Sequence, residues 1–182
     1  MQYIKTELED VYILEPKIFG DSRGYFLESF NKSNFEENIS SIDFVQDNES
    51  KSKYGVVRGL HFQKPPFDQA KLVRVTRGAV LDVAVDIRKD SKTYGKHIAV
   101  ELSEDNHRQL FIPRGFAHGF SVLTKEVVFQ YKCDNYYSPA DEGAILWNDS
   151  TLNIDWMIPS DQAIVSDKDL LNPLFDKFIS PF

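Results

Sequence analysis

The stretch KLVRVTRGAVLDVAVDI, residues 71–87, decides the fold class. It contains two runs rich in β-branched side chains, 72–76 and 79–87, and the pair Arg77-Gly78 separates them. β-Branched residues favour strands, and a glycine between two such runs is typical of a turn. In the first run Val73 and Val75 alternate with polar residues, as in a strand with one face in a core. We therefore expect two strands here, joined by a tight turn.

Runs of the same kind recur on both sides of this stretch, with turn residues between them. The further expected strands cover 55–62, 98–102, 109–112, 119–123, 126–132 and 143–147. Helix is scarce: Ser33 with Glu36 and Ser166 with Asp169 each form a capping box, which predicts two short helices. Many short strands at regular spacing predict an all-β fold, a double-sheet jelly roll of the cupin-like kind with a few short peripheral helices. With 42% apolar residues, we expect one domain over 1–182.

The charge balance narrows the possible partners. The net charge is −7, which argues against binding long nucleic acids, because that binding depends on many lysines and arginines that neutralise phosphates. A few local cations still permit a small phosphate-bearing ligand. The chain has one cysteine, Cys133, no apolar run near the ~20 residues that span a bilayer, and no apolar segment after Met1 that resembles a signal peptide. We expect a cytoplasmic protein without membrane association.

Two of the four histidines, His61 and His118, lie among apolar and aromatic residues. Such a histidine is either a satisfied core residue or an acid–base group, and the pattern alone leaves both open. A metal-binding jelly roll usually presents two histidines two positions apart on one strand, because alternate residues share a face. The sequence has no His-x-His and no His-x-x-x-His pair, and no flavin, dinucleotide or imine-cofactor motif. We therefore expect chemistry by side chains alone, with neither metal nor cofactor.

Strand alternation identifies further candidates around His61. Tyr131 shares a face with two apolar residues of its strand, so its hydroxyl could lie over a cavity or bond to backbone. Lys71 has the same parity as Val73, which places an ammonium inside the barrel or at its rim. Arg58 and His61 differ in parity and would lie on opposite faces of a regular strand. Gly59 between them is a possible bulge, and a bulge would let both side chains reach one cavity.

At these residues the sequence resembles a known family, the dTDP-4-dehydrorhamnose 3,5-epimerases, which are dimeric jelly-roll enzymes of deoxysugar biosynthesis. The resemblance covers nearly the whole chain through ordered motifs at matching spacing. These motifs are DSRGYFLE (21–28), FVQDN (44–48), VRGLHFQ (57–63), KLVR (71–74), DVAVD (82–86), PRGFAHGF (113–120), NYYS (135–138) and EG (142–143) followed by ILW (145–147).

The resemblance implies epimerisation at C3 and C5 of a dTDP-linked 4-keto-6-deoxyglucose, which gives the L-sugar precursor of rhamnose. By position in the family motifs, His61 is the base and Asp169 bonds to its far ring nitrogen. Tyr131 is the acid on the opposite face of the sugar, and Lys71 lies near the C4 oxygen. No metal or redox centre is required, because hydrogens beside a ketone are acidic enough for a positioned base. Asp169 also belongs to the second capping box, and it cannot serve both roles fully.

The family motifs also imply a binding shell and a homodimer. Arg23 and Glu28 match nucleotide contacts that reach across the dimer, and Gln46 and Asn48 match contacts to the thymine edges. Arg58 and Lys168 match contacts to phosphate or sugar oxygens. The other implied substrate-binding residues are Lys71, His118 and Glu142, with Phe19 and Tyr137 as candidates to stack on the base.

Three alternatives remain open at this point. A relative that inverts only one of the two carbons, or acts on another nucleotide sugar, would share this scaffold, and deuterium uptake at C3 and C5 separates these cases. A non-catalytic jelly roll that binds nucleotide sugars would keep the binding shell and form no product. A metal-dependent dioxygenase would lose activity on chelation.

Overall fold

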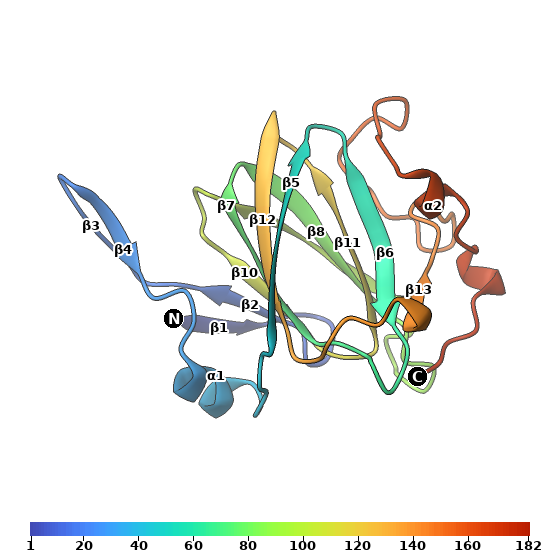
Figure 1. The fold of residues 1–182 in the computed structure, drawn as a ribbon, viewed down its shortest axis with the longest axis horizontal. Helices are drawn as coiled ribbons and strands as arrows, with labels where there is room; N and C mark the ends of the chain where they lie inside the picture. The colour runs from blue at the N-terminus through green and yellow to red at the C-terminus, as the bar shows by residue number, and fades with distance from the viewer.

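The structure is a computed structural model that describes residues 1–182. Two large antiparallel sheets face each other, and a separate hairpin extends away from them (Figure 1). The six-stranded sheet has the order β1-β2-β10-β7-β12-β5, and the five-stranded sheet has the order β13-β6-β11-β8-β9. In the six-stranded sheet the strands are β1 (Gln2–Lys5), β2 (Tyr12–Glu15), β10 (Gln109–Ile112), β7 (Lys71–Arg77), β12 (Glu126–Cys133) and β5 (Gln46–Lys53). In the five-stranded sheet they are β13 (Glu142–Ala144), β6 (Val57–Gln63), β11 (Phe116–Val122), β8 (Ala79–Asp86) and β9 (His97–Ser103). The predicted all-β double-sheet fold is confirmed.

The space between the two sheets holds the main apolar core. Val75 and Phe129 enter it from the six-stranded sheet, and Val80 and Phe120 enter it from the five-stranded sheet. The rings of Phe120 and Phe129 stack at 4.4 Å between centroids, with 19° between their planes. This stacked pair spans the interval between the sheets, because its two members belong to β11 and β12.

A second apolar cluster lies on the other side of the five-stranded sheet. Leu81, Val83 and Val85 alternate with the core residues of β8 and pack against the C-terminal segment, including Trp147 and Trp156. Because β8 is covered on both faces, its sequence is an almost unbroken apolar run.

Two short helices flank the sheets. The helix α1 (Lys32–Asn38) buries Phe35 in a small cluster on the six-stranded sheet. Its N-cap is Asn31, whose side chain accepts a hydrogen bond from the amide of Asn34 at 3.1 Å, so the predicted Ser33 capping box is wrong. Asn31 is itself a strong cap former, and it begins the helix two residues earlier. The helix α2 (Asp167–Leu170) begins at Ser166 as predicted.

The N-terminal strands were not among the expected ones. The segment Gln46–Lys53 is polar throughout and forms β5 at the edge of its sheet, where only Ser52 is buried. The strands β3 (Ile18–Asp21) and β4 (Gly24–Leu27) pair only with each other. Figure 1 shows this hairpin extending from the rest of the chain, and both of its faces are largely exposed. Neither segment has the apolar alternation of a half-buried strand.

Candidate active site

A cavity of about 160 Å³ lies between the two sheets, beside the stacked pair Phe120 and Phe129. It is lined from both sheets, by Ser50, Arg58, His61, Lys71, His118, Gly119, Phe120, Phe129 and Tyr131. Five of these residues, Arg58, His61, Lys71, His118 and Tyr131, were candidates from the sequence. The sequence thus predicted most of the polar lining.

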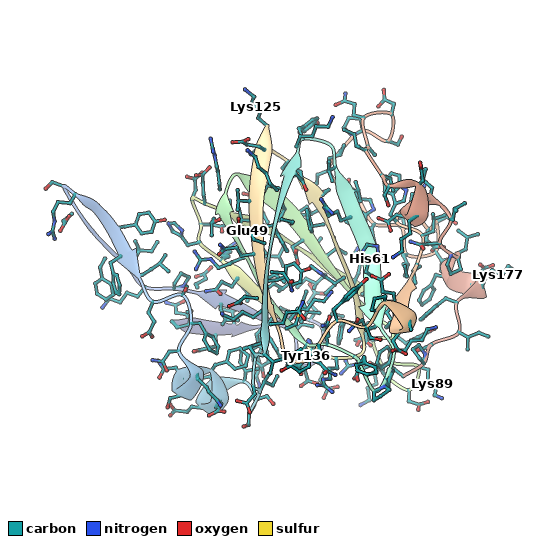
Figure 2. All side chains as sticks on the ribbon, in the orientation of Figure 1. Glu49, His61, Lys89, Lys125, Tyr136 and Lys177 are labelled. Carbon is teal, nitrogen blue, oxygen red and sulfur yellow. The ribbon has the colours of Figure 1, made fainter.

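His61 lies on β6 and faces this cavity (Figure 2). Its side chain is 42% exposed, and its Nε2 lies 2.6 Å from a carboxylate oxygen of Asp169 on α2. Ser166 caps α2 by accepting a hydrogen bond from the amide of Asp169 at 3.2 Å, and the Asp169 carboxylate bonds to the imidazole as well as to the Ser166 side chain. Burial raises the pKa of Asp169, but the hydrogen bond and the charge of His61 outweigh burial and hold this pKa below its usual value. An ionised carboxylate thus accepts a hydrogen bond from one ring nitrogen, so the other nitrogen can act as a base.

Gly59 explains how Arg58 and His61 line the same cavity. The pairing of β6 with β11 shifts register between His61 and Arg58, which is the predicted bulge. Gly59 has φ +127°, and a Cβ there would lie 2.6 Å from the Cα of Gly119. Only glycine fits this close approach of two strands without strain. The bulge therefore depends on Gly59.

Lys71 and Tyr131 enter the cavity from the opposite sheet. Tyr131 lies on β12, and the ammonium of Lys71 on β7 lies 5.9 Å from the centre of its ring. Burial raises the pKa of the Tyr131 hydroxyl, so this phenol keeps its proton at neutral pH. Burial lowers the pKa of Lys71, and the charges of Cys133, Asp82 and Glu142 oppose that shift. The arrangement sets a protonated phenol and an amine opposite an imidazole.

The sequence did not single out Asp82, which forms a second histidine–carboxylate pair in the structure. His118 lies directly across from His61 in the ladder between β11 and β6. Its Nε2 lies 3.0 Å from each carboxylate oxygen of Asp82, and both side chains are buried. The signal that could have identified Asp82 is its charge within the apolar run of β8, because a buried carboxylate requires a partner.

The side chains of Tyr137, Glu142 and Lys168 are joined by polar contacts beside the cavity, and we call this group the rim. Glu142 accepts a hydrogen bond from the Tyr137 hydroxyl at 2.8 Å and forms an ion pair with Lys168. The pKa of Glu142 is lowered by these two partners, although burial opposes the shift. The pKa of Lys168 is raised by Glu142. Lys168 also lines a neighbouring hollow of about 340 Å³ that shares His61 with the cavity. Lys168 therefore connects the rim to the site of His61.

The remaining candidates fall into two groups. Gln46 accepts a hydrogen bond from the amide of Tyr137 at 3.2 Å and donates one to Asn48 at 3.0 Å, so these two residues adjoin the rim. Phe19 and Arg23 lie on the exposed hairpin and line a different hollow. Glu28 follows the hairpin and accepts a hydrogen bond from Asn31 at 3.3 Å. Within one chain, Phe19, Arg23 and Glu28 do not line the cavity.

The site can bind a small polar ligand and move protons on it. No group of three or more histidine, cysteine, aspartate or glutamate side chains is arranged to hold a metal ion. None of the helices reaches the length and apolar character that crossing a bilayer requires. The fold and the site together define a jelly-roll protein with acid–base groups on both walls of one cavity.

Comparison with known proteins agrees with this class. The sequence profile described as dTDP-4-dehydrorhamnose 3,5-epimerase matches residues 5–177. The chain belongs to this family of epimerases. The dTDP-4-dehydrorhamnose 3,5-epimerase of Shigella flexneri is 56% identical over 171 residues, which is 93% of each chain.

Two solved structures show the same fold over nearly the full length. The crystal structure of dTDP-4-dehydrorhamnose 3,5-epimerase from Elizabethkingia anophelis is 53% identical, with a TM-score of 0.92 over 97% of this chain and 98% of the other. The crystal structure of dTDP-6-deoxy-D-glucose-3,5-epimerase from Legionella pneumophila, in complex with dTDP-4-keto-L-rhamnose, is 46% identical. Its TM-score is 0.94 over 98% of this chain and 94% of the other.

Proposed function

We propose that this protein is a dTDP-4-dehydrorhamnose 3,5-epimerase of dTDP-rhamnose biosynthesis. It inverts C3 and C5 of dTDP-4-dehydro-6-deoxy-D-glucose and releases dTDP-4-dehydro-L-rhamnose. Family membership supports the assignment, as does the relative that holds dTDP-4-keto-L-rhamnose. The observation that carries the proposal is that an imidazole from one sheet and a phenol from the other line one cavity.

His61 is the base in the proposed mechanism. The hydrogens on C3 and C5 flank the C4 ketone, and their removal spreads charge onto the ketone oxygen. His61 removes such a proton with the ring nitrogen that does not face Asp169. The resulting imidazolium is stabilised by the Asp169 carboxylate at 2.6 Å, in a charge-assisted hydrogen bond.

Lys71 and Tyr131 complete the reaction from the other sheet. Lys71 stabilises the enolate oxygen at C4, because an ammonium in a cavity of low polarity interacts strongly with developing charge. Inversion requires that the proton return to the face opposite the one that lost it. Tyr131 is placed for that donation, since it stands on the wall opposite His61 and retains its proton. Solvent then returns a proton to Tyr131 and removes one from His61.

The nucleotide is held at the rim. Tyr137 stacks on the thymine, Gln46 and Asn48 bond its edges, and Arg58 and Lys168 contact phosphate or sugar oxygens. His118 and Glu142 complete the substrate contacts. This placement leaves the sugar next to His61, because Lys168 lines the same hollow as His61 and His61 also lines the cavity.

We also propose that the protein is a homodimer. In the hairpin of β3 and β4, the side chains of Ile18, Phe19, Tyr25 and Phe26 are each 44–68% exposed. An isolated two-stranded hairpin is marginally stable in water, and an exposed apolar patch of this kind marks an interaction surface. A second copy of this chain would cover these side chains. The hairpin would then bring Phe19, Arg23 and Glu28 to the nucleotide of the partner's site. Sedimentation equilibrium measures the mass directly, and a monomer at micromolar concentration would contradict this part of the proposal.

Deuterium uptake tests the function. The protein is incubated with dTDP-4-keto-6-deoxyglucose in D₂O, and NMR follows label at C3 and C5 of the sugar. Label at both carbons, with dTDP-rhamnose formed once an NADPH-dependent reductase is added, is the expected result. Label at one carbon indicates a single-centre epimerase, and binding with neither label nor product indicates a non-catalytic protein.

A further inference from the structure

Gln63 has a buried side-chain amide at the end of β6 that forms hydrogen bonds to the backbone on both sides of Tyr137. Its Nε2 donates to the carbonyl of Tyr136 at 3.2 Å and to that of Phe67 at 2.6 Å. Its Oε1 accepts from the amide of Ser138 at 2.6 Å. Gln63 is 6% exposed, so these three bonds satisfy the amide away from solvent. A single side chain thus fixes the peptide units before and after Tyr137.

The segment that carries Tyr137 depends on side chains for its shape. The amide of Tyr137 donates to Gln46, and the only backbone bond of residues 136–138 is made by the carbonyl of Ser138, which accepts from Asp141. Gln46 lies on β5 and Gln63 on β6, so the two glutamines belong to different sheets. Residues 136–138 are therefore tied to both sheets by the side chains of Gln46 and Gln63, and Asn135 adds a local bond to the amide of Tyr136.

The hydrogen bonds from Gln46 and Gln63 to this backbone influence where the Tyr137 ring lies. The ring belongs to a residue that is 53% exposed, and its hydroxyl is held by Glu142 alone. The position of this half-exposed ring therefore depends on the backbone that carries it and on the hydrogen bond from its hydroxyl to Glu142. Without the hydrogen bonds from Gln63, the peptide units on both sides of Tyr137 can adopt more conformations. Binding a ligand must then order the ring again, which costs conformational entropy.

We infer that Gln63 is a positioning residue for recognition of the nucleobase, because it holds Tyr137 in place for stacking. The inference rests on the proposed function, in which Tyr137 meets the thymine. It assigns Gln63 no contact with the substrate. Removal of the Gln63 amide therefore weakens the binding of ligands that carry a nucleobase and leaves the binding of ligands that carry only phosphate unchanged.

The experiment compares two probes, dTDP and inorganic pyrophosphate, by calorimetry on the full-length protein. Gln63→Met keeps the length of the side chain and removes all three hydrogen bonds. We expect the Kd of dTDP to rise about tenfold, within the range that base–aromatic stacking contributes, with the Kd of pyrophosphate unchanged. In turnover, KM rises by a similar factor and kcat stays within about twofold, because the sugar still reaches His61.

Two further variants separate positioning from general damage. Asn106→Leu is the matched control: Asn106 also makes three hydrogen bonds to backbone, in the turn between β9 and β10, and it lines neither the cavity nor the rim. It should lower the melting temperature without changing the Kd of dTDP. Gln63→Glu keeps an acceptor for Ser138, but it sets a buried carboxylate against the carbonyls of Tyr136 and Phe67, so it should raise the Kd of dTDP at least as much as Gln63→Met does. Gln63→Leu, which is equally unable to form hydrogen bonds, replaces Gln63→Met in every comparison if the methionine variant does not fold.

A double-mutant cycle with Tyr137→Ala decides the matter. If Gln63 acts through the tyrosine ring, the Gln63 substitution has no further effect on the Kd of dTDP once the ring is removed. Additive losses overturn the inference, and so does an equal loss of dTDP and pyrophosphate. If the wild-type protein itself fails to bind dTDP, the proposed function is wrong. If it binds dTDP and Gln63→Met binds dTDP equally well, only the role of Gln63 is wrong.

Discussion

Asp169→Asn tests whether the carboxylate behind His61 contributes to proton abstraction. The substitution keeps the size and shape of the side chain and removes its charge. The amide can still accept a hydrogen bond from the imidazole through its oxygen, so the ring need not move. What is lost is the attraction between a carboxylate and the imidazolium that forms when His61 takes a proton.

The size of the effect follows from the contact. The Nε2 of His61 lies 2.6 Å from the Asp169 oxygen; the Asp169 side chain is 6% exposed, whereas the His61 side chain is 42% exposed, so water screens the pair from the histidine side only. A hydrogen bond to a charged group contributes ~1.5–3 kcal/mol. If that stabilisation belongs to the imidazolium alone, its loss slows abstraction by ~10- to 150-fold.

The assay is the initial rate of deuterium uptake from D₂O at C3 and C5, followed by NMR, with dTDP affinity measured in parallel. We expect uptake at both carbons to slow by that factor, while dTDP binds as tightly as it does to wild type. Ser166→Ala is the control for the position of α2: it removes the cap and one hydrogen bond that lowers the pKa of Asp169, but it keeps the carboxylate and its charge. Loss of the cap costs ~1 kcal/mol of stability and should leave the uptake rate close to wild type.

Two results would refute the reasoning. Uptake at the wild-type rate in Asp169→Asn would mean that the carboxylate does not stabilise the imidazolium. Equal slowing in Ser166→Ala would mean that the position of the helix matters and the charge does not.

Three further predictions concern the other buried polar groups. Tyr131→Phe removes the acid and keeps the base, so label should still be lost from C3 and C5 while little inverted product forms; NMR of the recovered sugar would contradict this if inversion continued at the wild-type rate. Lys71→Met should lower kcat by ~10²- to 10³-fold and raise the melting temperature, since it removes an amine whose burial opposes its charge; calorimetry showing a lower melting temperature would contradict the second part. Burial raises the pKa of Asp86, but hydrogen bonds from Arg88, Ser91 and Thr93 outweigh it and lower that pKa, so its stabilisation is complete above the unfolded value of ~3.9 and is lost as pH falls through the lower folded value. Asp86→Asn should therefore be less stable at pH 7 and lose less further stability on acidification below about pH 4, as circular dichroism melts at each pH would report.

The sequence predicted the strands from residue 55 onward, but it missed β2, which buries Leu14 inside the six-stranded sheet. Every expected strand from residue 55 onward has a counterpart in the structure, with ends that differ by up to three residues. The runs 72–76 and 79–87 were clear because the core selects β-branched side chains. The polar strand β5 and the hairpin of β3 and β4 gave no such signal. The former lies at an edge, and the latter has no apolar neighbour within the chain.

The same distinction holds for the candidate site. Parity placed Tyr131 and Lys71 on the inner face, and Gly59 indicated the bulge that brings Arg58 and His61 together. These inferences rest on local geometry. The pairs His61–Asp169 and His118–Asp82 join residues 108 and 36 positions apart, and strand periodicity carries no information on such contacts. The family resemblance suggested the first pair, whereas nothing in the sequence reading suggested the second.

The stacked rings of Phe120 and Phe129 have a consequence for how this site can change. The base and the acid belong to separate sheets, so the distance between them depends on the apolar side chains packed between these sheets. A smaller ring at either position would let the walls approach, and a bulkier one would spread them, with His61 and Tyr131 themselves untouched. Substitutions between apolar residues at Phe120 or Phe129 would therefore change which hexoses fit the site, while every acid–base group stays the same.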